Sequence, residues 1–250
     1  MGNHSASSLH LSILEKSPLF SGLPQPMLEE MLSVFHHKTY SKGLTISTEM
    51  LRTHFFIVLD GRIEVTRSNP NTGRSITLFL LGPGDGFDII TLLDGQPHNI
   101  EPTAMNDLQL LSAPIYTVRH WISAYPEFNQ RFLPYLGSLL RSMETLTVDL
   151  ALYDTASRLA RLILRHTDTR RHFEQPLSPL PVGLIADLKH EALARMLGSV
   201  RQVVNKHLQT LRKEAIVHYS NDSLLVKDLR ALKHQAGLAL HRLENKHDLS

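Results

Sequence analysis

The stretch LARMLGSVRQVVNKHLQTL, residues 193–211, is the most informative part of this sequence. Apolar residues recur at helical spacing on both sides of Gly198, which predicts two short helices, the second with an apolar face of Val200, Val203, Val204, Leu208 and Leu211. Its opposite face carries Arg201, Gln202, Asn205, Lys206 and Gln209. These side chains donate to phosphates and base edges, so the pattern predicts a DNA-binding helix-turn-helix. An ordinary helical hairpin with a solvated face is the alternative.

The residues that follow predict a β-hairpin. Apolar-rich segments at 216–219 and 224–227 flank a polar turn at 220–223, which is the pattern of strand, turn and strand. A hairpin directly after the second helix is the wing of a winged helix, and a wing tip lies near the phosphate backbone. The candidate DNA-binding residues are Ser199, Arg201, Gln202, Asn205, Lys206, Gln209 and His218.

The N-terminal and C-terminal parts of the chain differ in net charge. Residues 1–150 hold 10 Lys and Arg against 14 Asp and Glu, a net charge of −4. Residues 151–250 hold 16 against 10, a net charge of +6. A basic C-terminal part that contains the helix-turn-helix is the electrostatic pattern of a DNA-binding domain.

Composition excludes several kinds of site and location. The chain has no cysteine, which excludes disulfides and cysteine-ligated iron–sulfur clusters. Its 15 histidines show no H-x-H or H-E-x-x-H spacing, so we expect no metal site and interpret them as scattered surface and structural residues. Neither a membrane span nor a secretory signal is visible, so we expect a cytoplasmic protein without a membrane partner.

The segment from 44 to 115 differs from the preceding one in having the sequence pattern of β structure. Short apolar runs alternate with turns rich in Gly, Pro and Asn, which predicts a β-barrel or roll. Within it, 55–59, Asp60-Gly61 and 62–66 predict a tight hairpin, and 69–73 and 82–86 predict further turns. The preceding segment 9–40 predicts short helices.

A long helix is expected to open near Pro126. Apolar residues recur along it at alternating spacings of four and three, which is typical of a coiled-coil seam: Phe132, Leu136, Leu139, Met143, Leu146, Leu150 and Tyr153. A helix packed only on its own domain shares part of this pattern. The simplest partner is the same helix of a second subunit, so we expect a homodimer with this seam at its interface.

These segments together predict an α+β fold. We expect an N-terminal β-roll domain of the effector-binding type over 1–125, a dimerisation helix over 126–154, and a winged helix-turn-helix domain over 155–250. The last domain is expected to begin with a helix over 155–166 and to end with one from Asp228 to about Lys246.

This order of elements resembles the CRP/FNR family of bacterial transcription regulators over nearly the whole chain. SPLFSGLP at 17–24 resembles the opening of that family, and FIVLDGRIEV at 56–65 resembles its first β-hairpin. LGPGD at 81–85 resembles the entry to its effector cassette, and 193–211 resembles its helix-turn-helix. The resemblance implies a cyclic-nucleotide-binding-like fold and a regulator that binds double-stranded DNA.

The cassette departs from the nucleotide-binding members of that family. In those members a Glu holds the ribose hydroxyl, while an Arg and a Ser hold the cyclic phosphate. The matching positions, and hence the effector-pocket candidates, are Asp88, Ile89, His98 and Asn99. Ile89 cannot hydrogen-bond a ribose, and Asp88 adds negative charge where a phosphate would lie, so these residues argue against cyclic AMP. The cofactor is unknown: haem, another small molecule, a dinucleotide and no effector all stay open.

The second helix also departs from the family pattern. Arg201 matches the base-reading arginine and suits guanine O6 and N7. Gln202 replaces a Glu that accepts from cytosine, and Lys206 replaces a second Arg. Ser199 and Gln202 could instead form a capping box, in which case Gln202 would not read a base. Ala215 stands where a Gly often ends this helix, which costs up to about 1 kcal/mol if φ must be positive.

The expected function is therefore a homodimeric, sequence-specific transcription regulator on a palindromic operator, with no catalytic residues. RNA polymerase is a further partner if the protein is an activator. Two alternatives stay open: a haem-based gas-sensing regulator on the same scaffold, and a β-barrel metal enzyme with an attached DNA-binding domain. The latter would need several converging His ligands, and residues 44–115 contain only His54 and His98.

Overall fold

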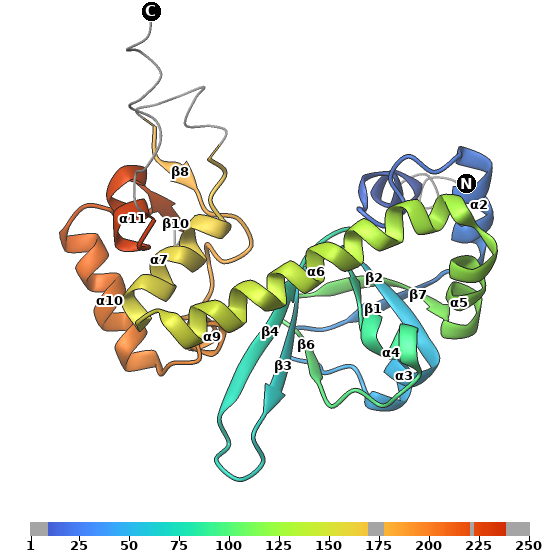
Figure 1. Cartoon of the computed structure of the whole chain (residues 1–250), viewed down its shortest axis with the longest axis horizontal. Coiled ribbons are helices and arrows are strands. Elements are labelled where there is room, and N and C mark those ends of the chain that lie inside the picture. The colour runs from blue at the N-terminus through green and yellow to red at the C-terminus, as the bar shows by residue number, and fades with distance from the viewer. Residues whose placement is uncertain (1–9, 170–177, 221–222, 239–250) are drawn as a thin grey trace, which may run out of the picture. The chain divides into compact units, whose positions relative to one another are not determined.

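Two units make up the chain, Met1–Thr145 and Leu146–Ser250, and the computed structural model describes residues 10–169, 178–220 and 223–238 (Figure 1). The α+β class is confirmed, because a β-rich first unit and a helix-turn-helix second unit share the long helix α6 (Pro126–Leu152). The expected helix opening near Pro126 is therefore present. No helix in the described ranges is long and apolar enough to cross a membrane.

The first unit contains two antiparallel sheets. The larger has the strand order β1-β7-β2-β5, with β1 at His36–Tyr40, β7 at Leu108–Pro114, β2 at His54–Asp60 and β5 at Gly86–Phe87. The smaller has the order β4-β3-β6, with β4 at Ser75–Leu81, β3 at Ile63–Ser68 and β6 at Glu101–Ala104. Residues 36–40 were expected to be helical, but they form edge strand β1, which pairs with β7.

The predicted hairpin around Asp60-Gly61 is wrong. Strand β2 pairs with β5 and β7, whereas β3 pairs with β4 and β6, so the chain crosses from one sheet to the other at this point. Gly61 has a φ of +87°, and a Cβ added there would lie 2.5 Å from the carbonyl oxygen of Asp107. The glycine thus allows a close backbone approach at the crossing, not a two-residue hairpin turn.

The burial of β2 explains its continuous apolar run. Successive side chains of a strand point to opposite faces, and both faces of β2 are covered. Phe55 and Ile57 belong to a core shared with helices, whereas Phe56 and Val58 belong to a core between the sheets. Those covering elements include α2 (Gln25–Val34), α5 (Ile115–Ala124) and the start of α6. Two shorter helices are α3 (Thr48–Thr53) and α4 (Ile89–Asp94).

The second unit has the expected winged helix-turn-helix. Its helices are α7 (Thr155–Arg165), α9 (His190–Met196), α10 (Arg201–Lys213) and α11 (Leu229–Gln235). Its strands are β8 (Leu180–Pro181), β9 (Val217–Ser220) and β10 (Ser223–Val226), in the order β8-β10-β9. Helix α11 ends at Gln235, before the end of the helix expected from Asp228 to about Lys246, of which residues 239–246 lie outside the described ranges.

A buried carboxylate ties the end of α6 to α7. Asp149 is 2% exposed and accepts from Nε of Arg161 and from Nη1 of Arg165, each at 2.5 Å. The guanidinium of Arg161 also lies 4.2 Å from the ring centre of Tyr153. Tyr153 was expected in the coiled-coil seam, but its ring contacts Arg161 of its own chain.

Candidate nucleic-acid interface and ligand cavity

Helix α10 separates its apolar and polar sides as expected from its spacing. Val204, Leu208 and Leu211 are buried against the rest of the second unit. Arg201, Gln202, Lys206 and Gln209 are exposed, and Asn205 is half-buried beside them. No acidic residue lies in the first turn of this helix, so its exposed face presents hydrogen-bond donors and positive charge.

The start of α10 rules out the capping box. A capping box needs Ser at the N-cap and Gln at the third helical position, but here the N-cap is Val200, and no side chain caps the helix within the described part of the chain. Ser199 lies one residue too early, so Gln202 is exposed and not engaged with Ser199. Val200 was assigned to the apolar face, yet it is 53% exposed beside Arg201 because it precedes the helix.

The hairpin after α10 is confirmed, with Tyr219 opposite Leu224 and His218 opposite Leu225. Its tip, residues 221–222, lies outside the described ranges. His218 is half-buried, and its Nδ1 atom is buried with no hydrogen-bond partner among the described residues. Only part of the ring is therefore accessible to DNA. Ala215 has a φ of +56°, so the chain does use the left-handed conformation that a glycine would favour there.

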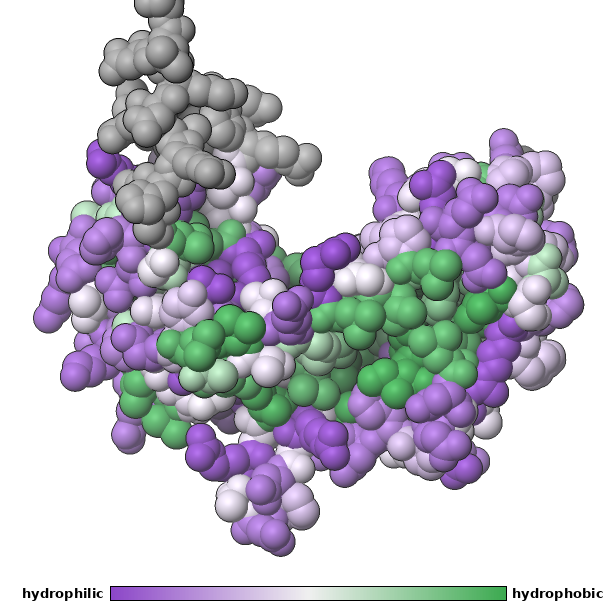
Figure 2. Space-filling view, in the orientation of Figure 1, coloured by the Kyte–Doolittle hydropathy of each residue, from purple (hydrophilic) through white to green (hydrophobic). Residues whose placement is uncertain are grey.

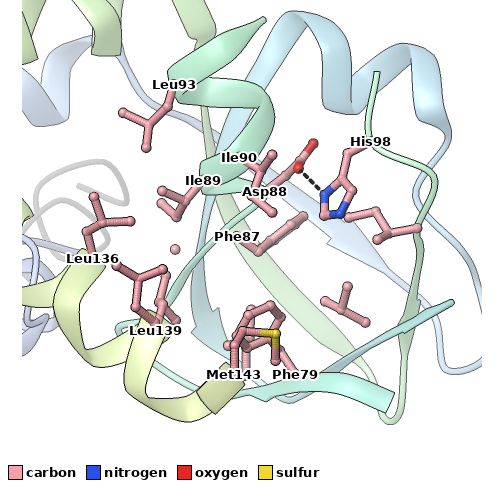
Figure 3. A pocket seen from close by; sticks show the side chains of 15 residues that line it. Phe79, Phe87, Asp88, Ile89, Ile90, Leu93, His98, Leu136, Leu139 and Met143 are labelled. Atoms are coloured by element: carbon pink, nitrogen blue, oxygen red, sulfur yellow. Dashed lines mark hydrogen bonds and ion pairs between the residues drawn. The ribbon is translucent and has the colours of Figure 1, made fainter. Parts of the chain in front are cut away.

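A cavity of about 100 Å³ lies in the first unit between the β-roll and α6 (Figure 3). Apolar side chains make up most of its wall. They come from the strands (Val65, Phe79, Leu81, Phe87), the cassette (Ile89, Ile90, Leu93, Ile100) and α6 (Leu136, Leu139, Leu140, Met143). Asp88 and His98 are the two residues with ionisable side chains among the fifteen that line it.

Two of the four effector-pocket candidates form a pair that the sequence did not predict. His98 Nδ1 lies 3.0 Å from Asp88 Oδ1, and Figure 3 shows this contact at the edge of the cavity. The side chain of Asp88 is 2% exposed, and its Oδ2 atom has no hydrogen-bond partner in the described ranges. Ile89 is buried in the wall, whereas Asn99 is exposed and does not line the cavity.

The residues of this cavity do not fit a cyclic nucleotide. The wall contains no arginine or lysine to neutralise a phosphate, and the buried Asp88 would oppose it. Haem does not fit the cavity either, because a volume of about 100 Å³ is below the roughly 300 Å³ at which pockets for drug-sized ligands begin. No group of three or more His, Asp or Glu in the described ranges could hold a metal ion.

Helix α6 has two apolar sides. Phe132 is 1% exposed and packs within the core of its own unit, together with Tyr135. The expected seam is therefore wrong at Phe132, because that ring is already buried without a partner. Leu133 and Leu140, seven residues apart and thus on one side of the helix, are 61% and 63% exposed. Figure 2 shows a hydrophobic area over this part of the first unit. Ile90 and Leu93 of α4 are also exposed, at 50% and 47%.

Tyr135 joins α6 to the strand that precedes Asp88. Its hydroxyl donates to the carbonyl oxygen of Gly86 at 2.9 Å and accepts from the Gly86 N–H at 3.1 Å. Burial, with the nearby charge of Asp85, raises the pKa of Tyr135, so the hydroxyl keeps its proton for the first of these bonds. A side chain of the long helix is thus fixed two residues from the Asp88–His98 pair.

Two family models match the chain. The model of a Crp-like helix-turn-helix domain matches residues 157–235, which include α7 to α11. The model of a cyclic nucleotide-binding domain matches residues 37–125, which include both sheets of the first unit.

Two relatives align with this chain over most of its length and nearly all of their own. The CRP-like cAMP-activated global transcriptional regulator of Mycobacterium tuberculosis is 25% identical over 225 residues, which are 90% of this chain and 98% of the relative. The cyclic AMP receptor protein of Thermus thermophilus is 28% identical over 229 residues, 90% of this chain and 100% of the relative. Among solved structures, a CooA mutant from Carboxydothermus hydrogenoformans has a TM-score of 0.67 at 26% identity, covering 83% of this chain and 90% of that one.

Proposed function

Because this chain belongs to the CRP/FNR family and is a DNA-binding transcription regulator, we propose that it acts as a homodimer on a palindromic operator without cyclic AMP. The observation that carries this proposal is the exposed face of α10, where Arg201, Gln202 and Lys206 are free to reach DNA while the opposite side is buried. Two such helices would enter successive major grooves about 34 Å apart.

Each residue of this face has a separate proposed role. Arg201 can form a two-pronged contact with the O6 and N7 atoms of a guanine. Lys206 carries a point charge suited to phosphate, and it cannot form the paired contact of an arginine. Gln202 reads a base, because the absence of a capping box leaves its amide available. Ser199, Asn205, Gln209 and His218 contribute secondary contacts.

The exposed side of α6 supports the homodimer. Leu133, Leu136, Leu140 and Met143 are spaced at three, four and three residues and are exposed or half-buried, which is the spacing of a coiled-coil seam. Leu136 and Leu139 are half-buried and also pack against the core of their own unit, so they lie at the border between that core and the proposed seam. Leu146 and Leu150 are half-buried further along α6, where we propose that the seam continues.

The lining of the cavity supports the proposed independence from cyclic AMP. Both relatives named above carry cyclic AMP in their names, yet the wall here has no cation and holds a buried carboxylate. We propose a cytoplasmic location for this regulator, and as an activator it would also contact RNA polymerase. We assign no catalytic role to any residue.

Selection of bound DNA from a random pool, with and without about 1 mM cyclic AMP, tests the proposal. We expect a palindromic site whose enrichment is the same in both pools. Arg201→Ala should cost about 1–3 kcal/mol per half-site and relax the preference at one position. Lys206→Ala should instead weaken specific and random DNA alike and reduce the salt dependence.

Gln202→Glu provides the matched test of base reading at the next position. If Gln202 reads a base, this change shifts the preference there toward cytosine, whose N4 amine donates to a carboxylate. Unchanged preference at every position in the Arg201→Ala variant would refute the docking of α10, and enrichment only with cyclic AMP would refute the proposed independence.

A further inference from the structure

An apolar side chain stands at the start of α10, on a face that is otherwise polar. Val200 is 53% exposed, and it lines the same surface hollow as Arg201, Gln202 and Asn205. By contrast, the buried side chains of α10 are all apolar and lie on the opposite side of the helix. Val200 is thus an accessible apolar group among side chains that donate hydrogen bonds.

Backbone hydrogen bonds on both sides fix the position of Val200. The Ser199 N–H donates to the Ala194 carbonyl oxygen at 2.9 Å, which closes the turn after α9. The Val204 N–H donates to the Val200 carbonyl oxygen at 3.2 Å, which is the first bond of α10. A valine side chain is also stiff, because two methyl groups on Cβ restrict its χ1 angle. The methyl groups therefore present a defined surface that loses little conformational entropy on contact.

Helix stability does not account for a valine at this position. Val200 is the N-cap of α10, with an extended backbone (φ −118°, ψ +150°), and no side chain among the described residues caps the helix. Valine is among the poorest N-cap residues, whereas a serine in this conformation accepts from a backbone N–H two or three residues further on. Because the side chain is mostly exposed, packing does not offset the missing cap.

We propose that Val200 reads the C5-methyl group of a thymine in the base pair next to the one that Arg201 contacts. The first residues of a recognition helix contact base edges, and the thymine methyl is the apolar group that the four bases present in the major groove. Consecutive Cα atoms are about 3.8 Å apart and consecutive base pairs about 3.4 Å apart, so neighbouring residues reach neighbouring pairs. This inference rests on the proposed docking of α10 and adds a specificity-determining residue to it.

Replacement of that thymine by deoxyuridine removes only the methyl group, so it tests the contact with the wild-type protein. The operator is the selected palindrome, and the guanine is located as the position at which Arg201→Ala relaxes the preference. Fluorescence anisotropy should show about fourfold weaker binding per substituted half-site, which is the contribution of one methyl group withdrawn from water. The inference is overturned if the two operators bind equally, or if neither neighbour of that guanine is a selected thymine.

One variant assigns the effect to Val200. Val200→Ser removes the methyl groups and supplies the missing cap, so it should abolish the preference for thymine over deoxyuridine and raise the melting temperature by about 2–4 °C. The matched control is Leu238→Ser, which removes a side chain that is 46% exposed outside α10 and should leave the preference unchanged. A preference that persists in Val200→Ser, or a loss accompanied by a lower melting temperature, would overturn the assignment.

The same measurements separate this inference from the proposed function. A protein that selects a palindrome and loses the preference at one position in Arg201→Ala, but binds the thymine and deoxyuridine operators equally, refutes the role of Val200 alone. A protein that selects no palindrome refutes the proposed function, and this inference falls with it.

Discussion

His166 makes the stability of the second unit depend on pH. The residue follows the last residue of α7, and its carbonyl oxygen accepts from the Gly183 N–H at 2.6 Å. Burial of the ring, with a smaller contribution from the charge of Arg165, lowers the pKa of His166 from 6.5 to about 4. Protonation therefore takes place in the unfolded chain below about pH 6.5 but in the folded chain only below about pH 4.

The sign and size of the effect follow from these two values. Between them the unfolded state binds more protons, so the free energy of unfolding falls as the pH is lowered from 6.5 toward 4, and above 6.5 no cost arises. A lowering of the pKa from 6.5 to about 4 corresponds to about 3 kcal/mol when the cost is complete. At pH 4.5 we expect about 2.5 kcal/mol of it.

The perturbation that isolates this effect is His166→Gln, which removes the titrating group. Hydrogen exchange of the α7 amides at pH 7 and pH 4.5, measured across a urea series, reports the stability of the second unit alone. The advantage of the wild type over His166→Gln should shrink by about 2–3 kcal/mol at the lower pH. His234→Gln, at an exposed histidine of α11, is the control. An identical pH dependence in the wild type and in His166→Gln would refute the argument.

Three further changes test other parts of the structure. Ala215→Gly should stabilise the protein by about 0.5–1 kcal/mol in urea unfolding, because φ is +56° and the side chain is exposed, whereas Ala151→Gly in α6 should destabilise it. Asp149→Asn should cost about 3 kcal/mol, because Arg161 and Arg165 lose a buried partner; a loss below about 1 kcal/mol, close to that of the exposed Glu144→Gln, would contradict this. Leu140→Glu should yield monomers in sedimentation, whereas Arg141→Glu on the same helix should not, and an unchanged dimer in Leu140→Glu would argue against the seam.

In the second unit, the local spacing of apolar residues was sufficient to predict the buried and exposed sides of α10. The spacing of Val204, Leu208 and Leu211 predicts the buried side of α10, and the same spacing places Arg201 and Lys206 on the exposed side. Gly198, with a φ of +56°, marks the turn between α9 and α10. The exposed N-cap at Val200 was missed, because a boundary shift of one residue decides whether a side chain packs or projects.

Nonlocal pairing explains what the sequence did not predict in the first unit. The Asp-Gly pair at 60–61 has the local signature of a hairpin, but β2 finds its partner in β7, about fifty residues away in sequence. The Asp88–His98 contact spans ten residues, which comprise α4 and the irregular chain after it, and it has no periodic signature. The seam failed at Phe132 because a heptad pattern does not distinguish packing on one's own domain from packing on a partner.

The two hydrogen bonds between the Tyr135 hydroxyl and the Gly86 backbone make Tyr135 a fixed point about which α6 can tilt. From Tyr135 to Thr145, the last residue of the first unit, the helix runs about 15 Å at 1.5 Å per residue. A tilt of about 5° at Tyr135 therefore displaces Thr145 by roughly 1.3 Å, which is comparable to the helix shifts of switching proteins. A sub-ångström adjustment of the Gly86–Asp88 backbone would in this way be magnified along α6 toward Thr145.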